Sequence, residues 1–184
     1  MNKAIIAVLG HDRPGILAKT TRILFQQSCN IENVSQTTLQ YEFAGIFIVS
    51  MPDDLALFTL KESLEENLTP HGLHIFIKDF EPGGAAAIPG PSEAFVITTK
   101  GPDQKGLVAE FTEVIARSGA NVTNLQAVFK GGIDPGDNIM IYEVDIPSDI
   151  DQHALYRNLR QKAETLDLDI SIQHRKIFEA INRI

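Results

Sequence analysis

Apolar and polar positions follow two different periods along this chain of 184 residues. The runs "AIIAVL" (residues 4–9) and "AFVITT" (residues 94–99) are apolar, rich in β-branched residues and too short for a helix, so each predicts a strand. A turn containing Gly and Asp follows each run, and apolar residues then recur at helical spacing. The two helical stripes are Ile16, Thr20, Ile23 and Gln27, and Leu107, Phe111, Val114 and Ile115.

Each predicted helix is followed by the same succession of elements. Two strands separated by a turn come first, at residues 34–41 and 46–51, and again at residues 125–130 and 139–146. The nearly continuous apolar run at 46–51 predicts a central strand, whereas the polar alternation of 34–41 predicts a half-exposed one. A second helix and a last strand close each half, the strands at residues 73–80 and 168–173. The second helical stripes are Leu57, Leu60, Leu64 and Leu68, and Leu155, Leu159, Ala163 and Leu166.

The two halves are also similar residue by residue. An offset of 91 places "GHDRPGILAKTTRILFQQSCNIENV" (residues 10–34) on "GPDQKGLVAEFTEVIARSGANVTNL" (residues 101–125). Farther along the chain the offset is 95, which indicates four extra residues in the second half. The turn-forming stretch "KGGIDPGDN" (residues 130–138) is the expected place of this insertion, because an insertion in a turn leaves the core pairing intact.

The order β-α-β-β-α-β, found twice, predicts an α+β protein made of two ferredoxin-like units. Each unit should have an antiparallel sheet of four strands with both helices on one face. We expect the first domain at residues 1–81, a linker rich in Gly, Ala and Pro at 82–93, and the second domain at 94–175. Residues 176–184 have apolar positions at helical spacing and predict an amphipathic tail.

Composition and charge limit the function more than the fold. The hydrophobic content of 43% is ordinary for a globular protein, and no apolar run has the length of about 20 residues that a membrane span needs. The single cysteine excludes an intrachain disulfide and fits a reducing compartment, so we expect a cytoplasmic protein. The net charge of −8 disfavours direct binding to nucleic acid, which usually requires a basic face.

The repeated turn before the first helix is the main candidate for chemistry. The first amides of a helix have no partner inside it and carry the positive end of its dipole, so they can bind a small carboxylate. Asp12 has the opposite charge, Gly15 permits close approach of the backbone, and Asn30 follows the far end of the helix. An amino acid carries both charges and would suit this arrangement. Alternatively, Asp12 caps the helix and Asn30 adopts a left-handed turn.

"DRPGIL" followed by "NIENV", and "PDQKGLVAEFTEVIARSGANV", resemble the ACT domain, a ligand-sensing module of metabolic enzymes and regulators. Two tandem copies most resemble the group of glycine cleavage system transcriptional repressors. The resemblance implies a homodimer paired through sheet edges and a small amino acid ligand of the glycine or serine class. Because the chain is acidic, we expect any effect on transcription to pass through a DNA-binding regulator as protein partner. It implies ligand-binding positions at Asp12, Gly15 and Asn30 and at Asp103, Gly106 and Asn121, and we include their neighbours His11, Arg13, Ile16, Ile31, Leu107 and Val122.

Catalytic signatures are missing from the sequence. It contains no P-loop, GxSxG, HExxH or CxxC motif, and we expect no metal and no cofactor. His71 and His74 lie in a predicted surface turn without a third ligand nearby, and Cys29 reads as a small buried residue. We therefore expect a non-catalytic regulatory protein. A ligand-independent assembly module and a small enzyme that uses Asp12 and His11 are the alternatives.

Overall fold

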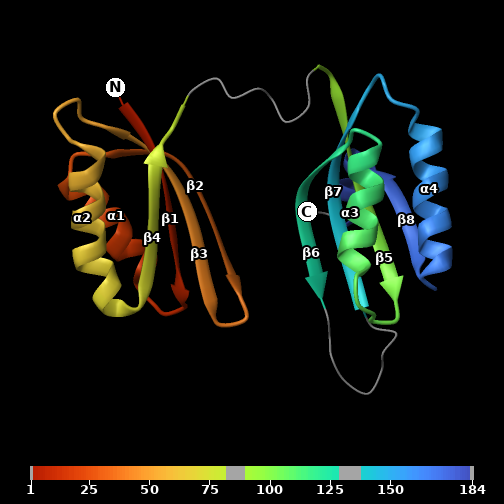
Figure 1. Ribbon diagram of the computed structural model, residues 1–184, viewed down its shortest axis with the longest axis horizontal. Coiled ribbons are helices and arrows are strands. Elements are labelled where there is room, and N and C mark those ends of the chain that lie inside the picture. The colour runs from red at the N-terminus through yellow and green to blue at the C-terminus, as the bar shows by residue number, and fades with distance from the viewer. Residues whose placement is uncertain (1, 82–89, 129–137, 183–184) are drawn as a thin grey trace. The chain divides into compact units, whose positions relative to one another are not determined.

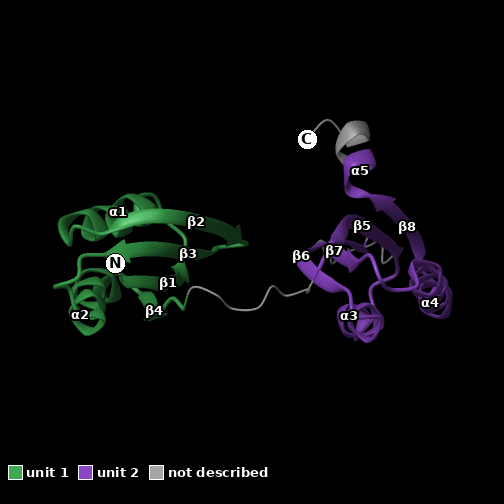
Figure 2. Ribbon diagram, turned by 90° about the horizontal axis from the view of Figure 1, so that it is seen from above, with its two compact units in different colours: residues 1–84 green, residues 85–184 purple. Residues whose placement is uncertain are grey.

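The computed structural model describes residues 2–81, 90–128 and 138–182 of the chain, and the side chains of residues 128 and 179–182 lie outside this description. The chain divides into two compact units, Met1–Gly84 and Ala85–Ile184 (Figure 2). Most of the expected linker and of the expected insertion lies outside the described residues.

Unit 1 is a sheet of four antiparallel strands with both of its α-helices on one face (Figure 1). The strand order is β2-β3-β1-β4. This is the predicted ferredoxin-like arrangement, with a short 3-10 helix before the last strand. The elements are β1 (Asn2–His11), α1 (Ile16–Gln26), β2 (Asn30–Leu39), β3 (Glu42–Met51), α2 (Leu57–Leu68), η1 (Thr69–His71) and β4 (Leu73–Asp79).

Unit 2 repeats this arrangement and adds a helix at its end. The strand order is β6-β7-β5-β8, again antiparallel throughout. Each sheet has one bulge at the start of its edge strand, between Ile31 and Asn33 in β2 and between Val122 and Asn124 in β6, so the duplication extends to this irregularity. The elements are β5 (Ser92–Gly101), α3 (Leu107–Arg117), β6 (Asn121–Val128), β7 (Asn138–Pro147), α4 (Gln152–Thr165), β8 (Asp169–His174) and α5 (Arg175–Asn182).

The predicted apolar stripes form the two cores. Leu60, Leu64 and Leu68 of α2 are fully buried, as are Leu155, Leu159 and Ala163 of α4. The prediction of a central strand at residues 46–51 is confirmed, since β3 lies between β2 and β1. The prediction that residues 34–41 are half-exposed was wrong. Every β2 residue except Ile31 is exposed, because β2 is an edge strand with a neighbour on one side only.

Two left-handed glycines set the limits of helices. Gly15 has φ +95°, which cannot continue into a helix, so α1 begins at Ile16 and Pro14 lies in the turn before it. Gly119, with φ +84°, follows the end of α3.

The C-terminal segment forms α5, which contacts β5 and β8. Figure 2 shows α5 on the side of the sheet opposite to α3 and α4. Within the part of the chain that the structure describes, no helix is long and apolar enough to cross a membrane.

Candidate functional site

The turn between β1 and α1 leaves the first amides of the helix open. Gly15 occupies the N-cap position, and no side chain of the described residues caps the helix there. These amides carry the positive end of the helix dipole, and the first turn of the helix contains no acidic residue. Asp12 does not cap α1, so that alternative reading of the sequence was wrong.

Two cations converge on the same turn. The guanidinium of Arg13 donates a hydrogen bond to the carbonyl oxygen of His71, and the ammonium of Lys19 contacts Nε2 of the His71 ring. The space among them is a hollow of about 250 Å³, which Gly15 and Ile16 also line. The hollow thus combines two positive side chains with the helix N-terminus, a combination that attracts a small anion.

Asp12 and His11 lie toward the β2–β3 hairpin. The backbone N–H of Asp12 donates to the Tyr41 carbonyl oxygen over 2.6 Å, and Asp12 Oδ2 accepts a hydrogen bond from Thr38 over 3.3 Å. His11 Nδ1 lies 3.5 Å from Glu42 Oε1. These contacts anchor the turn to the hairpin and leave the Asp12 carboxylate exposed.

Asn30 lies at the other end of the sheet. It pairs with Ser50, which pairs with Lys3 at the start of β1, whereas His11 at the end of β1 pairs with Glu42. Eight strand positions at about 3.3 Å each separate these ends by about 25 Å. Within unit 1, therefore, the structure does not bring Asn30 and Ile31 together with Asp12, Arg13, Gly15 and Ile16. The left-handed residue at the end of α1 is Ser28, with φ +56°, so the alternative reading of Asn30 was also wrong.

Unit 2 keeps the shape of the turn and changes its charge. Gly106 has φ +91°, and Gln104 Nε2 donates to the Leu166 carbonyl oxygen over 2.6 Å, which reproduces the contact of Arg13 with His71. Leu107 is only 2% exposed and packs in the core. Asp103 lies on the surface. Asn121 pairs with Asp145 at the far end of its sheet, so it too is remote from the turn.

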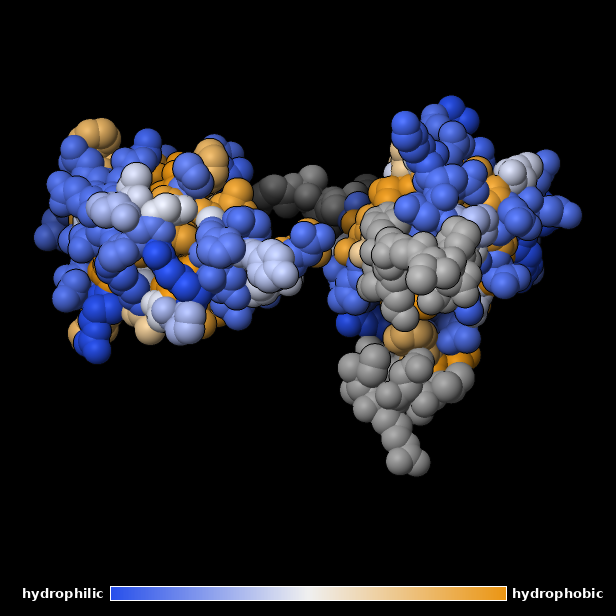
Figure 3. All heavy atoms as spheres, turned by 90° about the horizontal axis from the view of Figure 1, so that it is seen from below, coloured by the Kyte–Doolittle hydropathy of each residue, from blue (hydrophilic) through white to orange (hydrophobic). Residues whose placement is uncertain are grey.

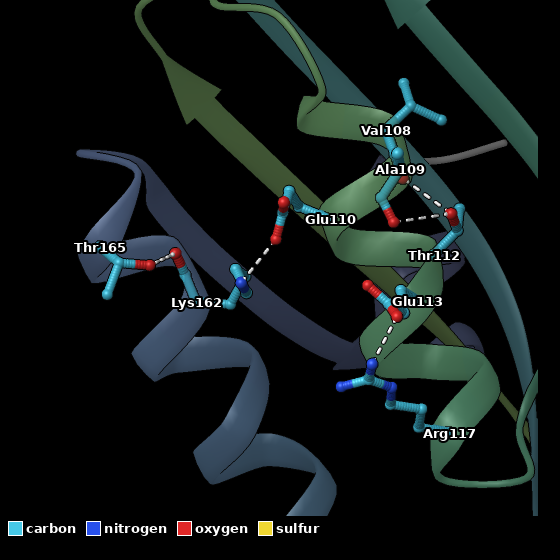
Figure 4. Close-up of polar contacts among 8 residues, drawn as sticks. All are labelled: Val108, Ala109, Glu110, Thr112, Glu113, Arg117, Lys162 and Thr165. Carbon is cyan, nitrogen blue, oxygen red and sulfur yellow. Dashed lines mark hydrogen bonds and ion pairs between the residues drawn. The ribbon is translucent and has the colours of Figure 1, made fainter.

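Glu110 occupies the position of Lys19. Its Oε2 lies 2.6 Å from Lys162 Nζ, which joins α3 to α4 (Figure 4). The hydrogen bond from Lys162 holds the pKa of Glu110 below its usual range. At these two positions, unit 2 has a neutral amide and an acid where unit 1 has two cations, so the two turns cannot favour the same ligand.

Lys19 and His71 were missed by the sequence reasoning. Lys19 carried a usable signal, because it follows Gly15 by four residues and must lie in the first turns of α1. His71 carried no such signal, because its contacts with Lys19 and Arg13 join residues that are 52 and 58 positions apart in the sequence. Among the described residues, no group of three potential metal ligands forms a site.

Comparisons with known proteins agree with the duplicated fold. The family model of the ACT domain matches residues 2–78 and 93–173. A UPF0237 protein of Methanopyrus kandleri is 33% identical over 79 residues, which cover 42% of this chain and 88% of that protein. A UPF0237 protein of Clostridium acetobutylicum is 36% identical over 78 residues, with the same two coverages.

Two solved structures match nearly the whole chain. An unknown protein from Galdieria sulphuraria superposes with a TM-score of 0.77 at 23% identity, covering 94% of this chain and 98% of that one. A candidate glycine cleavage system transcriptional repressor superposes with a TM-score of 0.69 at 20% identity, covering 94% and 96%. At these identities the likeness concerns the fold.

Proposed function

The chain belongs to the ACT domain family, and from this premise we propose that it is a non-catalytic regulatory protein that senses a small amino acid of the glycine or serine class. Its response reaches a protein partner in the cytoplasm. The observation that supports this proposal is the hollow at the start of α1, where Arg13 and Lys19 converge beside the open helix amides.

The hollow fits the carboxylate of such a ligand. Arg13 and Lys19 contact the backbone carbonyl oxygen and the ring of His71, and a carboxylate is a stronger acceptor than either. Asp12 precedes Arg13 and offers a negative charge for the ammonium group on the β2 side of the turn. In unit 2 the equivalents Gln104 and Glu110 offer no such pair of cations, so the proposal places the main site in unit 1.

Asn30 can contribute to the proposed site if two ACT units pair. Asn30 lies at one end of the edge strand β2, and Thr38, which binds Asp12, lies at the other. Two copies that pair antiparallel along this edge would bring Asn30 of one close to Asp12 of the other. Such a homodimer would also protect the exposed edge strand.

A transcriptional role would run through another protein. The structure of a candidate glycine cleavage system transcriptional repressor shares this fold, and the net charge of −8 disfavours direct DNA contact. We therefore propose a DNA-binding regulator as the partner, with control of glycine cleavage as the process.

The test is a titration of the purified chain with glycine, serine and a panel of other amino acids, followed by thermal unfolding. Binding to the folded state raises the melting temperature by mass action. The decisive variants are Arg13→Gln and Lys19→Glu, because these give unit 1 the side chains of Gln104 and Glu110, which the same fold accepts.

Lys61→Glu on α2 is the matched control, since it makes the same charge change as Lys19→Glu elsewhere in unit 1. We expect a shift in the wild type and in the control, and its loss in Arg13→Gln and Lys19→Glu. No shift with any amino acid, together with a defined oligomer, would favour the alternative of a ligand-independent assembly module.

A further inference from the structure

A polar hollow lies between α3 and α4 of unit 2. It has a volume of about 340 Å³, and its apolar lining is Val114, which also packs on the core. The four lining residues from α4 follow the spacing i, i+3, i+4 and i+7, so they share one face of that helix. We call this space the helix hollow. Its polar lining consists of Arg117 and Ser118 at the end of α3 and of Asn158, Gln161, Lys162 and Thr165.

Two ion pairs hold the cations of the helix hollow in place. Lys162 Nζ lies 2.6 Å from Glu110 Oε2, and Arg117 Nη2 lies 2.5 Å from Glu113 Oε1 (Figure 4). A guanidinium has five N–H donors and an ammonium has three, so each cation keeps donors for a further acceptor. The Arg117 side chain is 78% exposed, against 31% for Lys162. Arg117 is therefore the cation that an incoming anion can reach more easily.

The uncharged groups of the lining can both donate and accept hydrogen bonds. The hydroxyls of Ser118 and Thr165 each donate to the backbone carbonyl oxygen three residues earlier, over 2.6 Å and 2.8 Å, so toward a ligand they act as acceptors. The side-chain amides of Asn158 and Gln161 make no hydrogen bond with another described residue. A ligand that satisfies this lining needs an anionic group for Arg117 and hydroxyl groups that donate as well as accept.

Unit 1 closes the equivalent place with its own side chains. Gln27 Nε2 donates to Ser63 Oγ over 3.1 Å, which joins the end of α1 to α2. The equivalent positions in unit 2 are Ser118 and Asn158, and both line the helix hollow. The surface is largely hydrophilic on the side drawn in Figure 3, so polar side chains alone do not single out a site. The difference between the two units does, because it shows that the fold does not require an open hollow here.

We propose that the helix hollow binds a small hydroxylated anion, such as a sugar phosphate or a sugar acid. The phosphate or carboxylate of the ligand accepts hydrogen bonds from Arg117, and its hydroxyl groups meet the amides and hydroxyl oxygens of the lining. A volume of about 340 Å³ suits a ligand of this size. The site lies in unit 2 and does not depend on the proposed amino acid site of unit 1, so either proposal can fail alone.

The test is isothermal titration calorimetry of the purified full chain at fixed ionic strength. The hydroxylated anions are glucose 6-phosphate, ribose 5-phosphate and gluconate, and the last of these separates a carboxylate from a phosphate as the anionic group. Glucose lacks the anionic group, and inorganic phosphate lacks the hydroxylated chain. We expect at least one of the three hydroxylated anions to bind at least tenfold more tightly than glucose and inorganic phosphate.

Two variants separate the charge of the helix hollow from its shape. Arg117→Gln removes the cation that faces the ligand. The combination of Ser118→Gln with Asn158→Ser transfers the helix-joining hydrogen bond of unit 1 and fills the hollow without a change of charge. Arg160→Gln is the matched control, because it removes the same charge from α4 at a position that lines a different hollow.

The affinity should fall at least tenfold in both decisive variants and stay at the wild-type value in the control. Circular dichroism verifies that each variant is folded. The proposal is overturned if none of the three hydroxylated anions binds, or if the folded decisive variants bind as the wild type does. An equal loss in Arg160→Gln would place the binding elsewhere and overturn the site. Inorganic phosphate that binds as tightly as the sugar phosphates would overturn the ligand class.

Discussion

Arg13 donates a hydrogen bond to the carbonyl oxygen of His71, and Gln104 makes the equivalent bond to Leu166 in unit 2. Both bonds tie the turn before the first helix to the segment that follows the second helix. The bond is therefore common to both units, whereas the positive charge is particular to unit 1. A substitution at position 13 can therefore remove the positive charge and keep the hydrogen bond.

Arg13→Gln should leave the stability of the chain nearly unchanged, whereas Arg13→Ala should lower the free energy of unfolding by about 1 kcal/mol. The glutamine side chain can still donate to the His71 carbonyl oxygen, as Gln104 does in unit 2, but alanine removes the bond. Urea unfolding of the two variants checks this. Equal stability of the two variants would mean that the bond contributes nothing measurable.

Gly15→Ala should destabilise unit 1 by about 1–2 kcal/mol through backbone strain alone. The glycine has φ +95°, and an added Cβ would meet no atom within 4 Å, so a steric clash is not involved. Gly106→Ala should cost unit 2 a similar amount, because Gly106 has φ +91° and equally open surroundings.

Asparagine tolerates the left-handed region better than alanine, so Gly15→Asn should recover part of the loss. Denaturant unfolding of the three variants measures the effect. If Gly15→Asn were less stable than Gly15→Ala, strain would not be the cause.

The fold could be predicted because its signals are local. The apolar periods of 2 and 3.6 and the turn residues each specify elements without reference to distant parts of the chain. The duplication then supplied a second, independent reading of every element. The exposure of β2 was misjudged, because edge position depends on the order of strands in the sheet.

Only the turn in which the site lies could be predicted, and not the side chains that meet there. The turn before each helix was expected from the sequence, but the positive φ of Gly15 and Gly106 was not, and the meeting of Lys19 with His71 depends on how α2 ends and where η1 lies. That is a tertiary contact without a local pattern. The common face of the exposed residues Leu9, Ile46 and Phe76 was overlooked for a related reason, since they lie on three strands that only the register brings together.

Glu110→Gln should remove part of the acid sensitivity of unit 2. The bond from Lys162 lowers the pKa of Glu110 in the folded state from its ordinary 4.5. The ion pair therefore stabilises the fold above that value, and its contribution is lost as the pH falls through the lower folded pKa. Because the pair is partly exposed, the effect on the melting temperature should be small.

The measurement is thermal unfolding of the wild type and Glu110→Gln at pH values from 7 down to 3. The two profiles should differ above pH 4.5 and converge in acid. Glu113→Gln is the control, because Glu113 pairs with Arg117 on the same helix and does not join two helices (Figure 4). A constant difference between wild type and Glu110→Gln at all pH values would contradict the expectation.

Tyr142→Phe should protect unit 2 against alkaline unfolding. Burial between the sheet and the helices raises the pKa of Tyr142 from 10.0 to about 12, because the charged phenolate would lose its hydration. Below pH 10 both folded and unfolded states keep the proton, so stability is unaffected. As the pH rises from 10 to 12 the unfolded chain ionises first, and the free energy of unfolding should fall by about 2 kcal/mol. Phenylalanine has no proton to lose, so the variant should lack this part of the fall.

Absorbance of the phenolate measures the ionisation of the tyrosines, and urea unfolding at each pH measures the free energy of unfolding. Tyr41→Phe is the matched control, since Tyr41 is exposed on the β2–β3 hairpin and should leave the alkaline profile unchanged. Ionisation of all three tyrosines near pH 10 in the folded protein would show that burial of Tyr142 does not govern its titration.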